Sequence, residues 1–425
     1  MEDPDVIVVG AGAAGIIAAW RAALKGAKVV ILEKTTRVGT KILISGGGKC
    51  NITHDGPLEE VLRAFRPNEA RFIRPACYRF QNHQIVEMLT SRGLEVYTRP
   101  DGRIFPVGQT AKDVVRILTS YLEEVGVEIR FESPAIGLIS NNGSVTGVRY
   151  LDSTQTEREL RAPAVILSVG GSSYPGTGTT GDGWNWANEV GHTVVKIRAA
   201  LAPMYLSTDP ELLAEQSGIA LRDCLLKARF AGKEIARWTG DLLFTHHGVS
   251  GPTVLGISRI VAETLPGGPV TLEIDLAPNR SYETLSAEIL AAVTVHPKRF
   301  IASIVEEFVP RSLVVSILDA AEIAHDCVGM RLEKKARNRL ITVLKGWSLG
   351  PVRAVPLEKG EVVSGGIALD EVDPQTMKSK CVGGLYLCGE VLDIAGPVGG
   401  YNLQAAFATG YVAGETAAQS TFNKS

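Results

Sequence analysis

The sequence has no excess of charge of either sign. Its 44 lysines and arginines nearly balance 46 aspartates and glutamates, which leaves a formal net charge of -2 at pH 7. A chain with this balance creates no overall basic field that would attract nucleic acid or an acidic lipid surface. The composition therefore predicts no nucleic-acid partner.

Paired cysteines are also lacking. The cysteines are spread along the chain, with no Cys-x-x-Cys pair and no Cys/His group at zinc spacing. They are Cys50, Cys77, Cys224, Cys327, Cys381 and Cys388. We expect reduced thiols and no metal site. The absence also argues against a flavin disulfide reductase, which would need two redox cysteines beside the flavin.

Long uninterrupted apolar runs are missing too. The first apolar segment, Val6 to Trp20, follows an acidic start and is interrupted by glycines, so it does not fit a secretion signal. No other stretch approaches the ~20 apolar residues that a membrane helix needs. We therefore expect a cytoplasmic protein with no membrane partner.

What the chain does have is apolar content and length. With 425 residues, 45% of them hydrophobic, it can form two or three domains around large cores. The run Asp5 to Val9 predicts a buried strand, Ala13 to Lys25 predicts a helix that Gly26 would end, and Lys28 to Leu32 predicts a second strand. The N-terminus therefore reads as a strand, helix, strand unit.

The rest of the chain alternates between helical and strand patterns. Helices are expected over Pro57–Gly93, over Ser281–Lys345 and from Leu403 onward. Strands are expected over 126–149, with a hairpin turn at Asn141-Asn142-Gly143, and over 164–169, 225–230, 270–276, 355–367 and 384–388.

A dinucleotide-binding fingerprint lies between the first strand and helix. Gly10 permits a tight turn, Gly12 lets the backbone approach a pyrophosphate, and Gly15 allows the helix to pack closely on the strand. The helix N-terminus supplies N–H donors and a positive dipole for the phosphates. Glu33, at the end of the second strand, would accept hydrogen bonds from the ribose hydroxyls of the adenosine. An acidic residue there disfavours NADP, so FAD or NAD remains.

Four further segments carry a resemblance. GTKILISGGGKCN (Gly39 to Asn51) and GLYLCGEVLDIAGPVGGYNLQAAFATG (Gly384 to Gly410), with TGDGW (Thr180 to Trp184) and FTHHGVSGP (Phe244 to Pro252), are similar to segments of a bacterial flavoprotein family. These are NAD(P)/FAD-dependent oxidoreductases that include aminoacetone oxidase and a bile-acid-reducing enzyme of gut bacteria. The resemblance covers nearly the whole chain and favours FAD.

The resemblance implies where FAD would lie. Gly389-Glu390 would follow a strand and meet the ribityl chain and pyrophosphate, and Gly399 to Asn402 would present N–H groups to the pyrimidine edge of the flavin, which favours its reduced form. The glycine triplet between Lys41 and Lys49 would wrap around phosphate or ring. The residues assigned to FAD are Gly10, Gly12, Ala13, Ala14, Gly15, Glu33, Lys34, Lys41, Ser45, Gly46, Gly47, Gly48, Lys49, Ala135, Gly170, Gly389, Glu390, Gly400, Tyr401, Asn402 and Leu403.

Some positions depart from the family pattern or have an ordinary explanation. Lys49 replaces an expected arginine and His54 an expected asparagine, which puts planar bidentate contacts by that arginine in doubt. A single cysteine such as Cys50 favours packing over redox chemistry. His246 and His247 fit a substrate contact and a structural turn equally well. Trp184 and Trp186 are expected to pack in the core. No catalytic residue is assigned.

The expected fold class is α/β. A Rossmann-like FAD domain of the two-dinucleotide-binding type would be formed by residues 1–194 and 357–425. It would be interrupted by an insert, 195–356, whose existence the resemblance implies. The insert would have a β-barrel-like part, 195–280, and a helical part, 281–345. We expect the substrate pocket between insert and flavin.

The expected function is hydride transfer between flavin N5 and a small organic substrate or NAD(P)H. Because no second nucleotide fingerprint exists, NAD(P)H would bind only transiently as an electron donor. Two alternatives remain open, an NAD-dependent dehydrogenase without flavin and a flavin-binding protein of RNA modification or regulation. The sequence does not predict the substrate, the electron acceptor or the oligomeric state.

Overall fold

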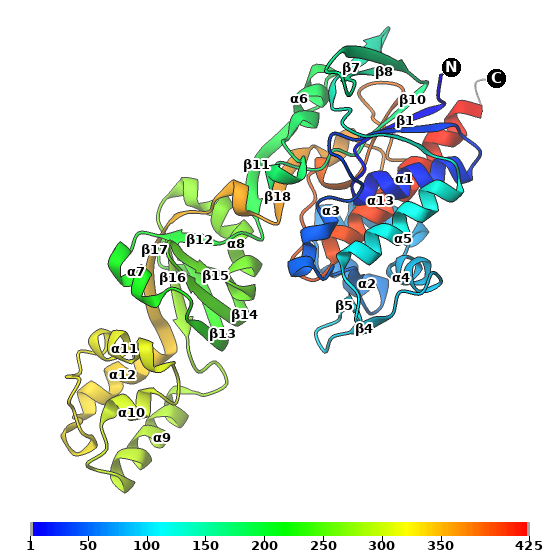
Figure 1. Ribbon diagram of the computed structural model, residues 1–425. Helices are drawn as coiled ribbons and strands as arrows, with labels where there is room; N and C mark the ends of the chain where they lie inside the picture. The colour runs from blue at the N-terminus through cyan, green and yellow to red at the C-terminus, as the bar shows by residue number, and fades with distance from the viewer. Residues whose placement is uncertain (1–2, 423–425) are drawn as a thin grey trace. The chain divides into compact units, whose positions relative to one another are not determined.

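The computed structural model describes residues 3–422, and the chain divides into two compact units (Figure 1). Unit 1 comprises the residues up to Arg198 together with those from Glu361 onward, and unit 2 comprises Ala199–Gly360. None of the described helices combines the length and the apolar character needed to cross a lipid bilayer.

A five-stranded parallel sheet forms the centre of unit 1, in the order β19-β10-β1-β2-β6. Its strands are β1 (Val6–Val9), β2 (Val29–Leu32), β6 (Glu128–Arg130), β10 (Ala164–Leu167) and β19 (Leu385–Leu387). Val6 pairs with Ala164 on one side and with Val29 on the other. Every residue of β1, β2 and β10 is buried, which explains why the sequence shows continuous apolar runs at these places.

Helices α1 (Ala13–Leu24) and α13 (Tyr401–Phe422) lie side by side in unit 1, as Figure 1 shows in blue and red. A Cβ atom on Gly410 would lie 2.3 Å from the Ala14 carbonyl oxygen, so glycine is needed for the two backbones to touch. Helix α13 begins at Tyr401 rather than at the predicted Leu403, because the Gly400 carbonyl already accepts from the Gln404 N–H.

Smaller elements complete unit 1. The helices are α2 (Leu58–Arg63), α3 (Pro67–Arg79), α4 (Asn82–Thr90), α5 (Ala111–Glu124) and α6 (Asp182–Glu189). Three small sheets are formed by β3 (Thr53–His54), β5 (Arg103–Pro106) and β4 (Val96–Thr98), by β7 (Ala135–Asn141), β8 (Ser144–Leu151) and β9 (Glu157–Arg161), and by β11 (Val194–Ala200) with β18 (Val362–Ile367). The predicted hairpin turn is confirmed, since Asn142 and Gly143 have φ of 47° and 74° between β7 and β8.

Unit 2 contains a closed barrel in the order β12-β15-β14-β13-β16-β17. Its strands are β12 (Met204–Leu206), β13 (Ala220–Phe230), β14 (Lys233–Thr245), β15 (Gly248–Ser250), β16 (Val270–Asp275) and β17 (Trp347–Ala354). Leu226, Phe244 and Ile274 are no more than 1% exposed and belong to the cluster that fills the unit. The strands after the helical segment begin at Trp347 rather than near Val355, because Trp347 is buried and packs against Phe244.

Helices extend the core of unit 2. They are α7 (Pro210–Gln216), α8 (Pro252–Thr264), α9 (Tyr282–Val295), α10 (Ile301–Val305), α11 (Val314–Ala320) and α12 (Lys334–Gly346). Leu285, Ile317 and Leu344 belong to the same apolar cluster as the barrel residues. The expected combination of a barrel and a helical part is therefore confirmed.

Candidate functional site

The turn between β1 and α1 has two packed glycines and one open glycine. Gly10 has φ of +95°, and a Cβ on Gly15 would lie only 1.9 Å from the Gly10 carbonyl oxygen. A Cβ on Gly12 would meet nothing within 4 Å. The backbone at Gly12 therefore faces open space at the N-terminus of α1, where N–H groups and the helix dipole favour an anion.

Glu33 joins the end of β2 to this turn. One carboxylate oxygen accepts from the Ala11 N–H at 2.7 Å and the other accepts from the Thr35 N–H at 2.7 Å. Its carbonyl accepts from the Ser133 N–H at 2.8 Å, so the segment that leads into Ala135 runs beside it. The structure thus places Glu33 against the glycine turn at Ala11, with the segment before β7 hydrogen-bonded to the Glu33 backbone. Lys34 has another partner and forms an ion pair with Asp182 at 2.9 Å.

The segment after β19 returns to the same turn. Gly389 has φ of +76°, and a Cβ on it would lie 2.8 Å from the Ala14 Cβ atom. Its N–H donates to the Thr409 hydroxyl at 3.1 Å. The structure therefore brings together a residue of the first helix and a residue 375 positions later in the chain.

Lys41 and Glu390 link the glycine-rich loop to this returning segment. The Lys41 ammonium lies 2.7 Å from a Glu390 carboxylate oxygen and donates to the Ser173 hydroxyl at 2.8 Å. The other Glu390 oxygen accepts from the Val363 N–H at 3.0 Å. A Cβ on Gly170 would lie 3.8 Å from the Glu390 carboxylate. This ion pair is partly exposed, so its main consequence is to fix the position of the loop.

The glycine triplet is a defined turn and not an extended linker. Residues Ile42–Gly48 form short 3-10 turns with a break at Ser45, whose hydroxyl donates to the Ile42 carbonyl at 2.8 Å. Gly46, Gly47 and Gly48 all have positive φ, which a residue with a side chain rarely adopts. A Cβ on Gly47 would meet nothing within 4 Å, and Lys49 is exposed. The loop thus offers open backbone beside a cation.

Residues after this loop contact the N-terminus of α13. The Asn51 side-chain amide, in the orientation that satisfies both its groups, accepts from the Gly400 N–H at 2.9 Å. His54 stacks on Tyr401 with ring centroids 4.6 Å apart. The Asn402 side chain bonds to both the N–H and the carbonyl of Gly396, at 2.8 and 2.9 Å. No local pattern in the sequence predicts the contact between Asn51 and Gly400, which lie far apart in the chain.

Core packing or a turn position accounts for the cysteine, tryptophan and histidine side chains that the sequence analysis did not assign to FAD. Cys50 is 1% exposed, and burial raises the pKa of its thiol to about 11, so it is protonated at neutral pH. Trp184 is buried and its indole N–H donates to the Val391 carbonyl at 2.9 Å. His246 and His247 form the exposed turn between β14 and β15 of unit 2.

One group of side chains has the composition of a metal site. His192, Glu371 and Cys381 have ligand atoms within 4.8 Å of one another. The His192 ring nitrogens lie 3.2 Å from a Glu371 oxygen and 2.8 Å from the Ser379 hydroxyl. Both nitrogens are therefore already hydrogen-bonded, and these contacts explain the buried histidine without an ion.

The residues of unit 1 fit a dinucleotide that carries a flavin. Open backbone at Gly47 lies in a loop that the Lys41–Glu390 ion pair connects to the strand end at Gly389, and Gly389 packs against Ala14 in the turn that contains the open backbone of Gly12. The N-terminus of helix α13 lies about ten residues before Gly410. It is therefore roughly 15 Å, measured along the helix axis, from the contact between Gly410 and Ala14. An extended molecule with a phosphate at one helix and a ring at the other matches this arrangement.

Comparison with known proteins identifies a family and relatives that match nearly the whole chain. The model of a family described as "HI0933-like protein Rossmann domain" matches residues 4–416. A ribosomal RNA dihydrouridine synthase of Haemophilus influenzae is 32% identical over 407 residues, which cover 95% of this chain and 96% of that protein. A 3-dehydro-bile acid delta(4,6)-reductase of Clostridium scindens is 30% identical over 423 residues, which cover 97% and 98%.

Solved structures agree at the level of the fold. A 3-ketosteroid delta1-dehydrogenase from Sterolibacterium denitrificans has a TM-score of 0.55 at 15% identity, with 98% of this chain and 99% of that chain covered. A 3-ketosteroid delta4-(5alpha)-dehydrogenase from Rhodococcus jostii has a TM-score of 0.53 at 17% identity, with 98% and 96% covered. The predicted fold class and the resemblance to a family that includes a bile-acid-reducing enzyme are confirmed.

Proposed function

Since this chain belongs to the HI0933-like family of FAD-binding oxidoreductases, we propose that it reduces a carbon–carbon double bond conjugated with a carbonyl group. Bound FAD would supply a two-electron carrier that exchanges hydride at N5. The names of the two relatives support this substrate class. A 3-dehydro-bile acid with delta(4,6) bonds has alkenes conjugated with its 3-oxo group, and dihydrouridine differs from uridine by reduction of an alkene conjugated with a ring carbonyl.

The structural observation that carries the flavin-binding part of the proposal is the contact of Gly389 with Ala14 beside the open face of Gly12. In this proposal the N–H groups at the start of α1 bind the pyrophosphate and Glu33 binds the ribose of the adenosine. The loop with Gly46, Gly47 and Gly48 would contact the cofactor, and Lys41 holds that loop in place through Glu390.

The N-terminus of α13 would orient the ring. Because the Gly400 N–H already donates to Asn51, the N–H groups of Tyr401, Asn402 and Leu403 are the ones proposed to face the pyrimidine edge. Their dipoles favour negative charge there and so stabilise the reduced state. NAD(P)H is proposed as a transient electron donor, without a fold of its own.

A second candidate substrate is a uridine in ribosomal RNA. The observation that favours it is the 32% identity to a ribosomal RNA dihydrouridine synthase over 95% of this chain. The small-molecule candidate rests on a similar identity to the bile-acid reductase, so the two must be separated by experiment.

The test uses purified protein with its bound flavin under anaerobic conditions. We expect a yellow protein with one FAD per chain that NADH or NADPH bleaches, and reoxidation of its flavin by a 3-oxo-delta4,6 steroid or by transcribed ribosomal RNA. Mass spectrometry of either product should detect the gain of two hydrogens. A colourless protein that reduces NAD would instead support a dehydrogenase without flavin. A reduced flavin that neither substrate reoxidises would refute the proposed substrate class.

A further inference from the structure

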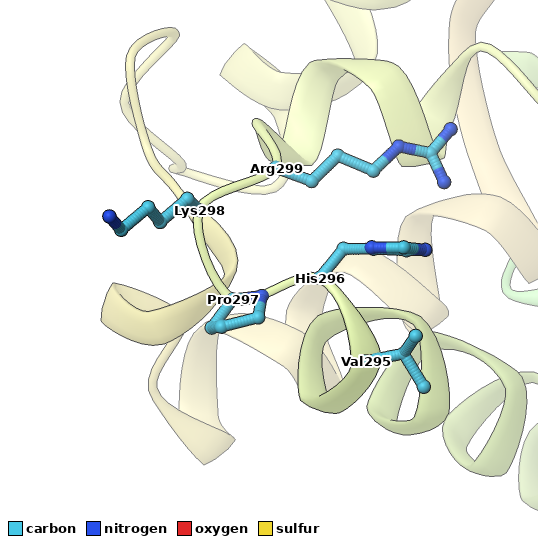
Figure 2. Close-up of a pocket in the computed structure, with 5 residues that line it drawn as sticks. All are labelled: Val295, His296, Pro297, Lys298 and Arg299. Carbon is cyan, nitrogen blue, oxygen red and sulfur yellow. The ribbon is translucent and has the colours of Figure 1, made fainter.

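A loop of unit 2 between α9 and α10 lines a surface hollow of about 520 Å³. The hollow is lined by Val295, His296, Pro297, Lys298 and Arg299. Figure 2 shows that the imidazole of His296 and the guanidinium of Arg299 point the same way, while Lys298 points to the other side of the loop.

A second basic segment is attached to this loop. The Met330 N–H donates to the Pro297 carbonyl at 2.8 Å, and the Gly329 N–H donates to the Arg299 carbonyl at 2.9 Å. Four residues after Met330, helix α12 begins with Lys334. We call residues 295–300 and 329–335 together the basic loop surface.

The cations of this surface are mostly without acidic partners. It contains Lys298, Arg299, Arg331, Lys334 and Lys335 against a single acidic residue, Glu333. Arg299 pairs with the neighbouring Glu307 at 3.1 Å. Among the described residues, no acidic side chain lies within ion-pair distance of the other four. Positive charge is therefore concentrated here although the whole chain is slightly acidic.

Apolar side chains are exposed between these cations. Val295, Met330 and Phe300 are 68%, 61% and 51% exposed, and the first two are the most exposed of all the large apolar residues in the described part of the chain. Unpaired cations beside exposed apolar and aromatic groups are what single-stranded nucleic acid needs, because phosphates meet the cations and unstacked bases meet the apolar groups.

We propose that the basic loop surface binds single-stranded segments of ribosomal RNA. The proposal rests on the RNA candidate of the proposed function, and it assigns RNA recognition to unit 2. Phosphates contact the lysines and Arg331, while unpaired bases pack on Phe300, Met330 and the His296 ring. An anionic membrane would also attract cations beside apolar groups, so vesicles form one arm of the test.

The experiment measures binding of labelled, transcribed ribosomal RNA by the FAD-loaded protein over a salt titration. The test variant is Lys298→Glu/Lys334→Glu/Lys335→Glu. The control, Lys112→Glu/Lys233→Glu/Lys359→Glu, makes the same change of charge at exposed lysines elsewhere. We expect the test variant to bind at least about tenfold more weakly at 0.15 M salt, with the slope of log affinity against log salt reduced by about 2. Phe300→Ala should weaken binding about fivefold or more without changing that slope.

Equal weakening by both triple variants, or no RNA binding by the parent protein, would overturn the proposal. So would binding to phosphatidylglycerol vesicles through these lysines with no RNA bound. Failure of the proposed function has a different signature. If RNA binds through this surface and no dihydrouridine forms, the proposed RNA substrate is wrong, whereas the proposed RNA-binding surface is supported. If the test variant forms dihydrouridine as well as the parent protein does, the proposed RNA-binding surface is wrong, whereas the proposed RNA substrate is supported.

Discussion

Unit 1 and unit 2 each have a core of buried apolar side chains, but the glycines of unit 1 also form the backbone turn of the candidate cofactor site. In unit 1, backbones touch at glycines, with Gly15 against the Gly10 carbonyl and Gly410 against the Ala14 carbonyl. In unit 2, the core is filled by large side chains such as Phe244, which is 1% exposed in the closed barrel. The glycines around the β1–α1 turn therefore shape a backbone surface for a ligand, whereas the barrel side chains of unit 2 only fill a volume. Substitutions in the two units should therefore fail in different ways.

The largest effect is expected for Gly15→Ala. The new methyl group would lie 1.9 Å from a backbone oxygen, so the turn must shift, and we expect a loss of roughly 3 kcal/mol or more in the free energy of unfolding together with loss of FAD. Gly12→Ala is the matched control, since its methyl group meets nothing within 4 Å. That variant should unfold like the parent and yet retain FAD at least about tenfold less well. Thermal unfolding measures the stability of both variants, and flavin content measures their FAD retention. Normal FAD retention by Gly12→Ala would show that the pyrophosphate does not bind at Gly12.

Phe244→Ala should lower the stability of unit 2 by about 3–5 kcal/mol, because it leaves a cavity in the barrel. Flavin content of the folded protein should stay unchanged, because none of the proposed FAD contacts lies in unit 2. The neighbouring Leu243 is 39% exposed, so Leu243→Ala should cost less than about 1 kcal/mol. Chemical denaturation and flavin absorbance test this pair. Release of FAD from the folded Phe244→Ala protein would contradict the separation of roles.

Glu33→Ala should weaken FAD binding by about tenfold to a hundredfold, because a charged acceptor contributes about 1.5–3 kcal/mol to its hydrogen bonds. The loss of its bonds to Ala11 and Thr35 should also lower the melting temperature. Glu128→Ala, in the neighbouring strand β6, removes an exposed carboxylate and serves as the control. Isothermal titration of the apoprotein with FAD measures the affinity. Equal affinities in the two variants would place the adenosine elsewhere.

The smallest effect concerns the pH dependence of unit 1. Burial lowers the pKa of His192 despite the hydrogen bond to Glu371, so its folded-state pKa lies below that of the unfolded chain. As the pH falls, His192 is therefore protonated in the unfolded chain before it is protonated in the folded protein. The free energy of unfolding then decreases as the pH drops through the ordinary histidine pKa of about 6.5. His192→Gln should flatten this dependence between about pH 7 and pH 5. Denaturation curves at several pH values measure it, and an unchanged slope would show that another group controls it.

The sequence predicted those parts of unit 1 whose signal is local. The strand, helix and strand at the N-terminus follow from continuous apolar runs and a glycine turn, and the hairpin at Asn142 follows from its turn residues. Helix α5 and the sheet of β3, β4 and β5 were not predicted. The signal for α5 was present, since Thr110 and Asp113 form a capping box before apolar positions at helical spacing. The two-residue strand β3 gives no such signal.

Local sequence patterns were sufficient to predict the Rossmann-type turn, because Gly10, Gly12 and Gly15 have the spacing that it needs and Glu33 follows the second strand. Turn geometry and strand burial depend on neighbouring residues, so they can be read locally. Three long-range contacts became visible only in the folded chain, namely Gly389 with Ala14, Lys41 with Glu390, and the Asn51 side chain with the Gly400 N–H. Those contacts join residues far apart in the chain, and no local pattern encodes which of them will meet.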